Sequence, residues 1–233
     1  MCEICGLPVP APSRRTVLLG GLAAFAASAL PASAQSVADT VDPDAALQRL
    51  IDGNARYASG TRTNTDFSVG RAQRALTQRP FAAILSCADS RVSPDLAFDQ
   101  GPSDLFVVRL AGNFVSDDGL ASLEYAVNFL GTRLIMVLGH SNCGAVDAAI
   151  KVVRDKIELP GHLPEMLRKI KPAAETALAA DGDILNTAIT ENVRLGVNRL
   201  TTAEPIIAGQ VASGGVKVVG AVYDLATGSV GLV

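Results

Sequence analysis

The sequence has no tryptophan, and only 4% of its 233 residues are aromatic. Its four cysteines are too few for a disulfide-stabilised scaffold. Basic residues do not dominate, since 20 Lys and Arg stand against 23 Asp and Glu, so the charge gives no reason to bind nucleic acid or anionic lipid. With 48% hydrophobic residues and a mean hydropathy of +0.30, the chain is not disordered. This composition indicates a compact globular protein.

The N-terminal region lacks a hydrophobic run long enough to span a membrane. Arg14 and Arg15 precede an uncharged run at residues 17–30, and the small residues 32–34 follow it. A basic start, a short apolar run and a small-x-small end predict a secretory signal peptide over residues 1–34. The paired arginines favour a twin-arginine signal, which exports folded proteins, and an ordinary export signal is the alternative.

We therefore expect the mature chain to comprise residues 35–233 and to work in the periplasm or outside the cell. No stable insertion of this chain into a membrane is expected. Cys2 and Cys5 would leave with the signal peptide, so the mature chain would keep only Cys87 and Cys143.

Short apolar runs alternate with helical patterns along the rest of the sequence, without internal repeats or linkers. We expect strands at residues 81–86, 105–108, 134–138, 216–223 and 229–233. We expect helices at residues 44–58, from Asp117 or Asp118 to Leu130, from Gly144 onward and across 185–200. Residues 59–77 are expected to form a loop with a short helix. Continuous apolar runs are typical of strands buried on both faces. The pattern predicts one α/β domain, a mostly parallel β-sheet flanked by helices, with an N-terminal helical arm.

Two motifs with metal-binding side chains directly follow two of these predicted strands. Cys87-Ala-Asp89-Ser-Arg91 comes after the run at 81–86, and His140-Ser-Asn-Cys143 comes after the run at 134–138. Ligands of open α/β sheets bind beyond the carboxyl ends of the strands, so both motifs lie where a site is expected.

Cys87, His140 and Cys143 are three of the four ligands that a tetrahedral zinc ion takes, which leaves one position open for chemistry. The spacing of His140 and Cys143 lets one turn present both, and the predicted helix start at Cys143 favours its thiolate. A disulfide between the two cysteines is an alternative in an oxidising compartment, and so is a redox dithiol. A structural zinc module would need a fourth protein ligand.

The two motifs resemble the signatures of the β-class carbonic anhydrases, Cys-x-Asp-x-Arg and His-x-x-Cys. Residues 98–102, 106–113 and 220–228 also resemble that family. The resemblance implies a lyase with one Zn²⁺ per subunit, bound by Cys87, His140 and Cys143, that converts CO₂ and water reversibly to bicarbonate and a proton. A carbon disulfide or carbonyl sulfide hydrolase on the same zinc site is the alternative.

The resemblance also implies catalytic roles for Asp89 and Arg91. Zinc makes hydroxide available at mild pH, and this hydroxide attacks CO₂. Asp89 would accept its hydrogen while Arg91 keeps Asp89 ionised and oriented; away from a cysteine the pair would be interpreted as a turn-stabilising ion pair. In some members the aspartate becomes a fourth zinc ligand in a closed state that uses a pocket tryptophan. Because the chain has no tryptophan, we expect an open site.

Three further residues match the plant-type subgroup of that family. Gln78 stands where those members place an amide that binds substrate, and Phe106 and Tyr125 match aromatic residues that line the pocket across a dimer interface. A helix-end glutamine and ordinary core aromatics are the alternatives. The shared pocket implies a homodimer or higher homo-oligomer, with CO₂ or bicarbonate as the small-molecule partner.

Overall fold

The computed structural model describes residues 41–233, and the predicted signal peptide lies outside them. Its five strands are β1 (Ala82–Ser86), β2 (Leu105–Arg109), β3 (Leu134–His140), β4 (Lys217–Tyr223) and β5 (Val230–Leu232). They form one sheet in the order β2-β1-β3-β4-β5, in which only β5 runs antiparallel to its neighbour. The predicted α/β fold with a mostly parallel sheet is confirmed.

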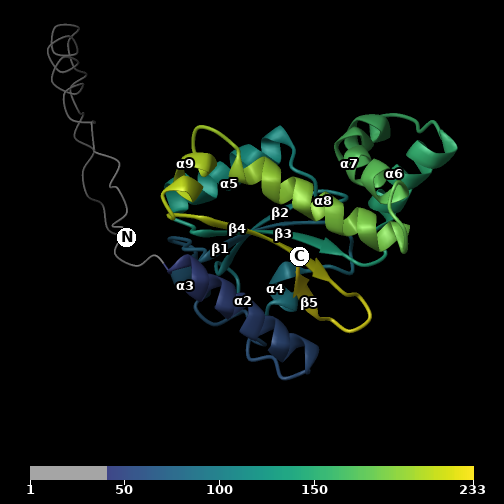
Figure 1. Cartoon of the computed structure of the whole chain (residues 1–233). Coiled ribbons are helices and arrows are strands. Elements are labelled where there is room, and N and C mark those ends of the chain that lie inside the picture. The colour runs from purple at the N-terminus through teal and green to yellow at the C-terminus, as the bar shows by residue number, and fades with distance from the viewer. Residues whose placement is uncertain (1–40) are drawn as a thin grey trace, which may run out of the picture. The chain divides into compact units, whose positions relative to one another are not determined.

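Helices cover both faces of this sheet (Figure 1). They are α2 (Pro43–Ala58), α3 (Arg71–Arg74), α4 (Pro94–Ala97), α5 (Asp117–Leu130), α6 (Gly144–Asp155), α7 (Leu163–Leu178), α8 (Ile184–Thr201) and α9 (Ile207–Ala212). Helices α2 and α4 lie on one face, and α5, α8 and α9 lie on the other (Figure 1). The sheet is therefore the middle layer of three.

The central strands β1 and β3 are buried at every position, as their continuous apolar runs predict. Side chains alternate along a strand, so each strand supplies both cores. Ala82 and Ile84 pack in the core under α2, whereas Ala83 and Leu85 pack in the core shared with α5 and α8. This double burial fixes the carboxyl ends of β1 and β3 side by side, where the two metal-binding motifs begin.

Helix α2, the predicted N-terminal helix, packs on the sheet and is fixed there by one buried asparagine. The Nδ2 group of Asn54 donates to the carbonyls of Ala97 and Gly228, both at 2.9 Å. Its Oδ1 accepts from the N–H of Val230 at 2.8 Å. A single side chain thus joins α2 to α4 and to the C-terminal hairpin.

A buried aspartate fixes the start of the long loop that leads to Gln78. Asp99 accepts hydrogen bonds from the Arg56 side chain at 2.6 Å and from the backbone N–H groups of Thr63 and Asn64 at 3.0 and 2.9 Å. Burial opposes charge on Asp99, but these bonds hold its pKa below the usual range. The loop is consequently tied to α2 at one end.

The helix at 117–130 begins at Asp117, one of its two predicted starts. Ser116 is the N-cap, because its side chain accepts from the N–H of Gly119 at 3.0 Å. Asp117 and Asp118, the two residues at which the helix was expected to start, lie in its first turn and do not cap it. Carboxylates stabilise a helix there through its dipole, so both positions favour the same helix.

Helix α7 has no counterpart among the predicted elements. Pro172 lies inside it, and a proline normally interrupts a helix. Its buried face is largely alanine at positions 173, 174 and 177, which gives a weak hydrophobic pattern. Packing against α6 and α8 in one hydrophobic cluster stabilises α7 despite this sequence.

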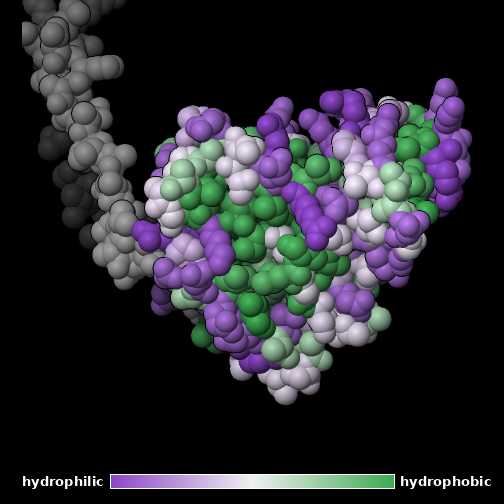
Figure 2. Space-filling view, viewed as in Figure 1, coloured by the Kyte–Doolittle hydropathy of each residue, from purple (hydrophilic) through white to green (hydrophobic). Residues whose placement is uncertain are grey.

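The edge strands leave surfaces that another chain could cover. Within residues 41–233, β2 and β5 each have a strand on one side only. On the face shown in Figure 2, hydrophobic residues gather over β4 and the C-terminal strand, where Leu232 and Val233 are 53% and 44% exposed. Unpaired strand edges such as those of β2 and β5 favour pairing with a second chain.

Among residues 41–233, no helix is long and apolar enough to cross a bilayer.

Candidate metal centre and active site

Cys87, His140 and Cys143 come together at the carboxyl end of the sheet. All three are buried, and their ligand atoms lie within 4.8 Å of one another. Bonds of about 2.3 Å to sulfur and about 2.0 Å to nitrogen would let one zinc ion contact all three after small side-chain adjustments. Both cysteines are free thiols, so the structure contains no disulfide between them.

Three local features of the backbone place these ligands. Cys87 directly follows β1, and His140 is the last residue of β3, the neighbouring strand. The chain then turns through Asn142, whose φ of 54° lies in the left-handed region that asparagine tolerates. This turn makes Cys143 the N-cap of α6, so the strand end and the helix start deliver two ligands.

The ring of His140 is oriented for metal binding. Its Nδ1 lies 2.9 Å from the Ser141 carbonyl, which places the ring proton on Nδ1. Its Nε2 is buried and has no hydrogen-bond partner. Buried polar atoms normally have a hydrogen-bond partner, so an unpartnered nitrogen beside two thiols indicates a metal ligand.

Hydrogen bonds stabilise the anionic form of Cys87. The Cys143 thiol, the neighbouring His140 imidazole and the backbone N–H groups of Gly112 and Asp89 lower the pKa of Cys87 to about 4 although burial opposes it. The Cys87 anion and burial in turn raise the pKa of Cys143, and this outweighs the N–H groups at the start of α6. The N–H groups at the helix start lower the pKa of Cys143, but too little for the predicted Cys143 thiolate to form first, so Cys87 is the sulfur that carries the negative charge. Zinc needs both sulfurs deprotonated, so its binding would release the shared proton.

Asp89 and Arg91 form a two-bond ion pair beside the cluster. The Nε and Nη2 groups of Arg91 donate to the two carboxylate oxygens at 2.9 and 2.7 Å, and they hold the pKa of Asp89 well below its usual range. Asp89 Oδ2 also lies 3.8 Å from Nε2 of His140. The carboxylate is thus ionised, directed by Arg91 and next to the ligand atoms.

A second arginine supports this turn and was missed by the sequence analysis. Arg109, the last residue of β2, donates from Nε to the Cys87 carbonyl at 3.1 Å and from Nη2 to the Asp89 carbonyl at 2.7 Å. Its position at the carboxyl end of the strand beside β1 is the signal that could have identified it. Arg109 positions the backbone that carries both a ligand and the carboxylate.

The structure does not bring Gln78, Phe106 and Tyr125 into the metal-binding cluster of their own chain. Gln78 is exposed and precedes β1, whereas Cys87 follows it, and five strand residues at about 3.3 Å each separate these ends. Phe106 lies near the start of the edge strand β2, with its ring 6.4 Å from that of Tyr125. Tyr125 is 47% exposed and stacks on Phe129, which is 65% exposed. Tyr125 and Phe129 are thus exposed beside the half-buried Phe106 at the sheet edge.

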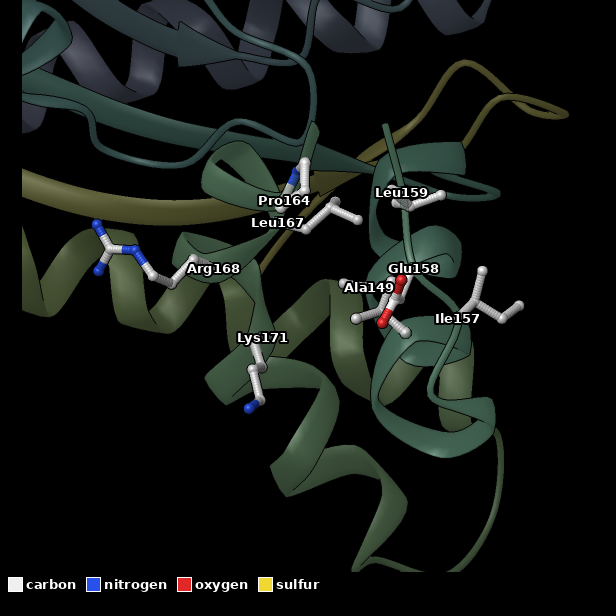
Figure 3. A pocket seen from close by; sticks show the side chains of 9 residues that line it. Ala149, Ile157, Glu158, Leu159, Pro164, Leu167, Arg168 and Lys171 are labelled. Atoms are coloured by element: carbon white, nitrogen blue, oxygen red, sulfur yellow. The ribbon is translucent and has the colours of Figure 1, made fainter. Parts of the chain in front are cut away.

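An apolar cavity of about 470 Å³ lies elsewhere, between α6, α7 and the segment that joins them (Figure 3). Its apolar lining includes Ala149, Ile157 and Leu167, with Arg168 and Lys171 among its charged residues. None of the predicted site residues lines it. The cavity is therefore separate from the metal-binding cluster.

Comparison with known proteins agrees with this geometry. The family model described as Carbonic anhydrase matches residues 82–230, which include every residue of the cluster. The solved structure of the β-carbonic anhydrase CcaA has a TM-score of 0.65 and 30% identity, over 80% of this chain and 94% of that one. The chain belongs to the β-class carbonic anhydrases. It is thus a lyase of a zinc-dependent class, and zinc fits the free thiols and orphaned histidine nitrogen described above.

Other carbonic anhydrases are similar over most of their length. The carbonic anhydrase of Mycolicibacterium smegmatis is 37% identical over 193 residues, which cover 82% of this chain and 93% of that protein. One of two tetrameric β-carbonic anhydrases from Sordaria macrospora has 25% identity and a TM-score of 0.63, over 80% of this chain and 96% of that one. The similarity extends well beyond the two motifs.

Proposed function

We propose that the chain catalyses the reversible hydration of CO₂ to bicarbonate and a proton at zinc bound by Cys87, His140 and Cys143. The observation that carries this proposal is the ionised Asp89 next to three buried ligands that leave one coordination position open. A structural zinc site would fill that position with a fourth protein ligand. Among the described residues, no fourth cysteine or histidine joins the group.

The bound ion would supply Lewis acidity, which makes a water-derived nucleophile available at mild pH. Asp89 would accept a hydrogen bond from that nucleophile and so direct one of its lone pairs at the carbon of CO₂. Arg91 keeps that carboxylate ionised through its two bonds. We infer that Asp89 stays on Arg91 and does not become a metal ligand, because this chain lacks the tryptophan of the closed-state pocket.

A comparison of substrates on one preparation tests the proposed reaction. Carbonyl sulfide and carbon disulfide are linear like CO₂ and would use the same metal chemistry, so the residues alone do not separate them. We expect kcat/KM for CO₂ hydration to exceed that for hydrolysis of either sulfur compound. Faster hydrolysis of carbonyl sulfide or carbon disulfide would make the sulfur compound the substrate instead.

We further propose a homodimer of the plant-type subgroup, in which each active site receives Gln78, Phe106 and Tyr125 from the other subunit. Gln78 lies at the wrong end of β1 to reach Cys87 of its own chain. The exposed aromatics beside the open β2 edge offer a surface for the second copy. The tetrameric neighbour from Sordaria macrospora supports assembly into at least a dimer.

Mixing a variant of reduced activity with an inactive one tests whether the site is shared. Gln78→Ala should lower kcat/KM about tenfold, the effect of losing one hydrogen bond to substrate. Cys143→Ser removes a zinc ligand. In a two-fold dimer, unfolding and refolding the two together should restore about a quarter of the wild-type activity, because half the dimers contain one complete site. A mixture no more active than the mean of the separate variants would contradict the shared site.

We also propose that residues 1–34 direct twin-arginine export to the periplasm or the exterior. Assembly of the zinc thiolates in the reducing cytoplasm would protect Cys87 and Cys143 from oxidation, whereas an unfolded chain exported first would risk a disulfide. Arg14→Lys with Arg15→Lys should abolish export and leave active enzyme in the cytoplasm, measured by fractionation and CO₂ hydration. Normal secretion of the double variant would contradict the twin-arginine route.

A further inference from the structure

The sulfur of Cys87 rests against a tight turn that contains no metal ligand. The N–H of Asn113 closes this turn by donating to the Leu110 carbonyl at 2.9 Å. Gly112, its third residue, has a φ of +84°, a conformation that turns of this kind reserve for glycine. The N–H of Gly112 donates to the Cys87 sulfur at 3.2 Å.

A buried asparagine on a distant helix holds this turn in place. The Nδ2 group of Asn192 on α8 donates to the Gly112 carbonyl at 2.8 Å, and Asn192 is only 2% exposed. From the other side, the end of Ile170 on α7 lies where a β-carbon on Gly112 would come within 2.4 Å of it. Gly112 is therefore fixed between α7 and α8, with its N–H directed at the sulfur.

We propose that Asn192 is a positioning residue for the metal site, because it holds the Gly112 N–H on the sulfur of Cys87. The inference rests on the proposed zinc site. An N–H bond to a metal-bound thiolate withdraws charge from the sulfur and restricts its rotation. Loss of the Asn192 side chain would free the turn and leave the sulfur without this bond. The Cys87 side chain would then rotate more freely and release the metal more easily, while its sulfur would carry more negative charge.

Asn192→Leu in the full mature enzyme is the main test, since leucine has a similar size but no donor. Zinc transfer to a chelator should become about 10- to 100-fold faster, the range found when partners of metal ligands are removed. In cobalt-substituted protein, the sulfur-to-metal charge-transfer band should move to longer wavelength. A purely stabilising role for Asn192 would lower the melting temperature without moving this band.

Asn198→Leu is the matched control, because Asn198 is exposed on the same helix. It should change neither the zinc transfer rate nor the band.

Wild-type protein substituted with ¹¹³Cd offers a test that needs no folded variant, since the Gly112 amide proton should show scalar coupling to cadmium through the sulfur.

Two results would overturn the role of Asn192. One is an unchanged band and zinc transfer rate in folded Asn192→Leu, and the other is absence of the Gly112 coupling in the wild type. Wild-type protein that takes up no zinc, cobalt or cadmium would instead contradict the metal site itself.

Discussion

Asp89→Asn should leave zinc in place and lower kcat/KM for CO₂ hydration by about 100- to 1,000-fold, the cost of removing one directed group that acts on the reacting atoms. The amide keeps the shape of the side chain but loses the charge that Arg91 orients through two bonds. It can also turn a donor toward the nucleophile, where an acceptor is required. Zinc content and stopped-flow hydration, measured on the same sample, separate the loss of chemistry from the loss of metal.

Asp118→Asn is the matched control, because Asp118 is an exposed aspartate in the first turn of α5. It should retain both zinc and activity. Full activity of Asp89→Asn with one zinc per subunit would contradict the role of Asp89 as hydrogen-bond acceptor. Loss of zinc from this variant would instead make Asp89 a metal ligand and contradict the proposed open site.

His140→Ala should abolish stoichiometric zinc binding and reduce CO₂ hydration by more than about 100-fold. Mutation of a residue that only hydrogen-bonds a metal ligand already lowers metal affinity or activity about 10- to 100-fold, and His140 is a ligand itself. The imidazole is buried, its Nδ1 is fixed by Ser141, and its Nε2 has no other partner. Among residues 41–233, no histidine or cysteine outside the cluster lies close enough to join it in place of His140. Atomic absorption and the hydration assay measure the two effects.

His162→Ala serves as the control, because His162 is the other histidine of the chain and lies exposed at the start of α7. It should behave as the wild type. Stoichiometric zinc in His140→Ala would show that the metal binds elsewhere.

The sheet and the metal cluster were predictable because short, continuous segments of the sequence determine both. Residues 81–86 and 134–138 are continuous apolar runs, and strands buried on both faces require such runs. A strand buried in a parallel sheet ends at the edge where ligands bind, so the positions of Cys87 and His140 after these runs already placed them together. The pairing of Asp89 with Arg91 was also local, two residues apart.

What surrounds the cluster was not predictable, because it depends on contacts between distant segments. Arg109 reaches carbonyls 20 and 22 residues away, and Asn192 reaches one 80 residues away. No periodicity marks such residues. Helix α7 was missed because Pro172 and its alanines weaken the local pattern, while the packing that stabilises it comes from α6 and α8.

The most direct test of the account is to measure zinc and CO₂ hydration together in the purified mature chain. The account predicts one zinc per subunit, activity that falls in parallel with zinc when a chelator removes it, and recovery of both when zinc is restored. Cys87 and Cys143 should become reactive to a thiol reagent only in the zinc-free protein. Catalysis that persists without zinc, or bound zinc that leaves both thiols reactive and supports no hydration, would contradict it.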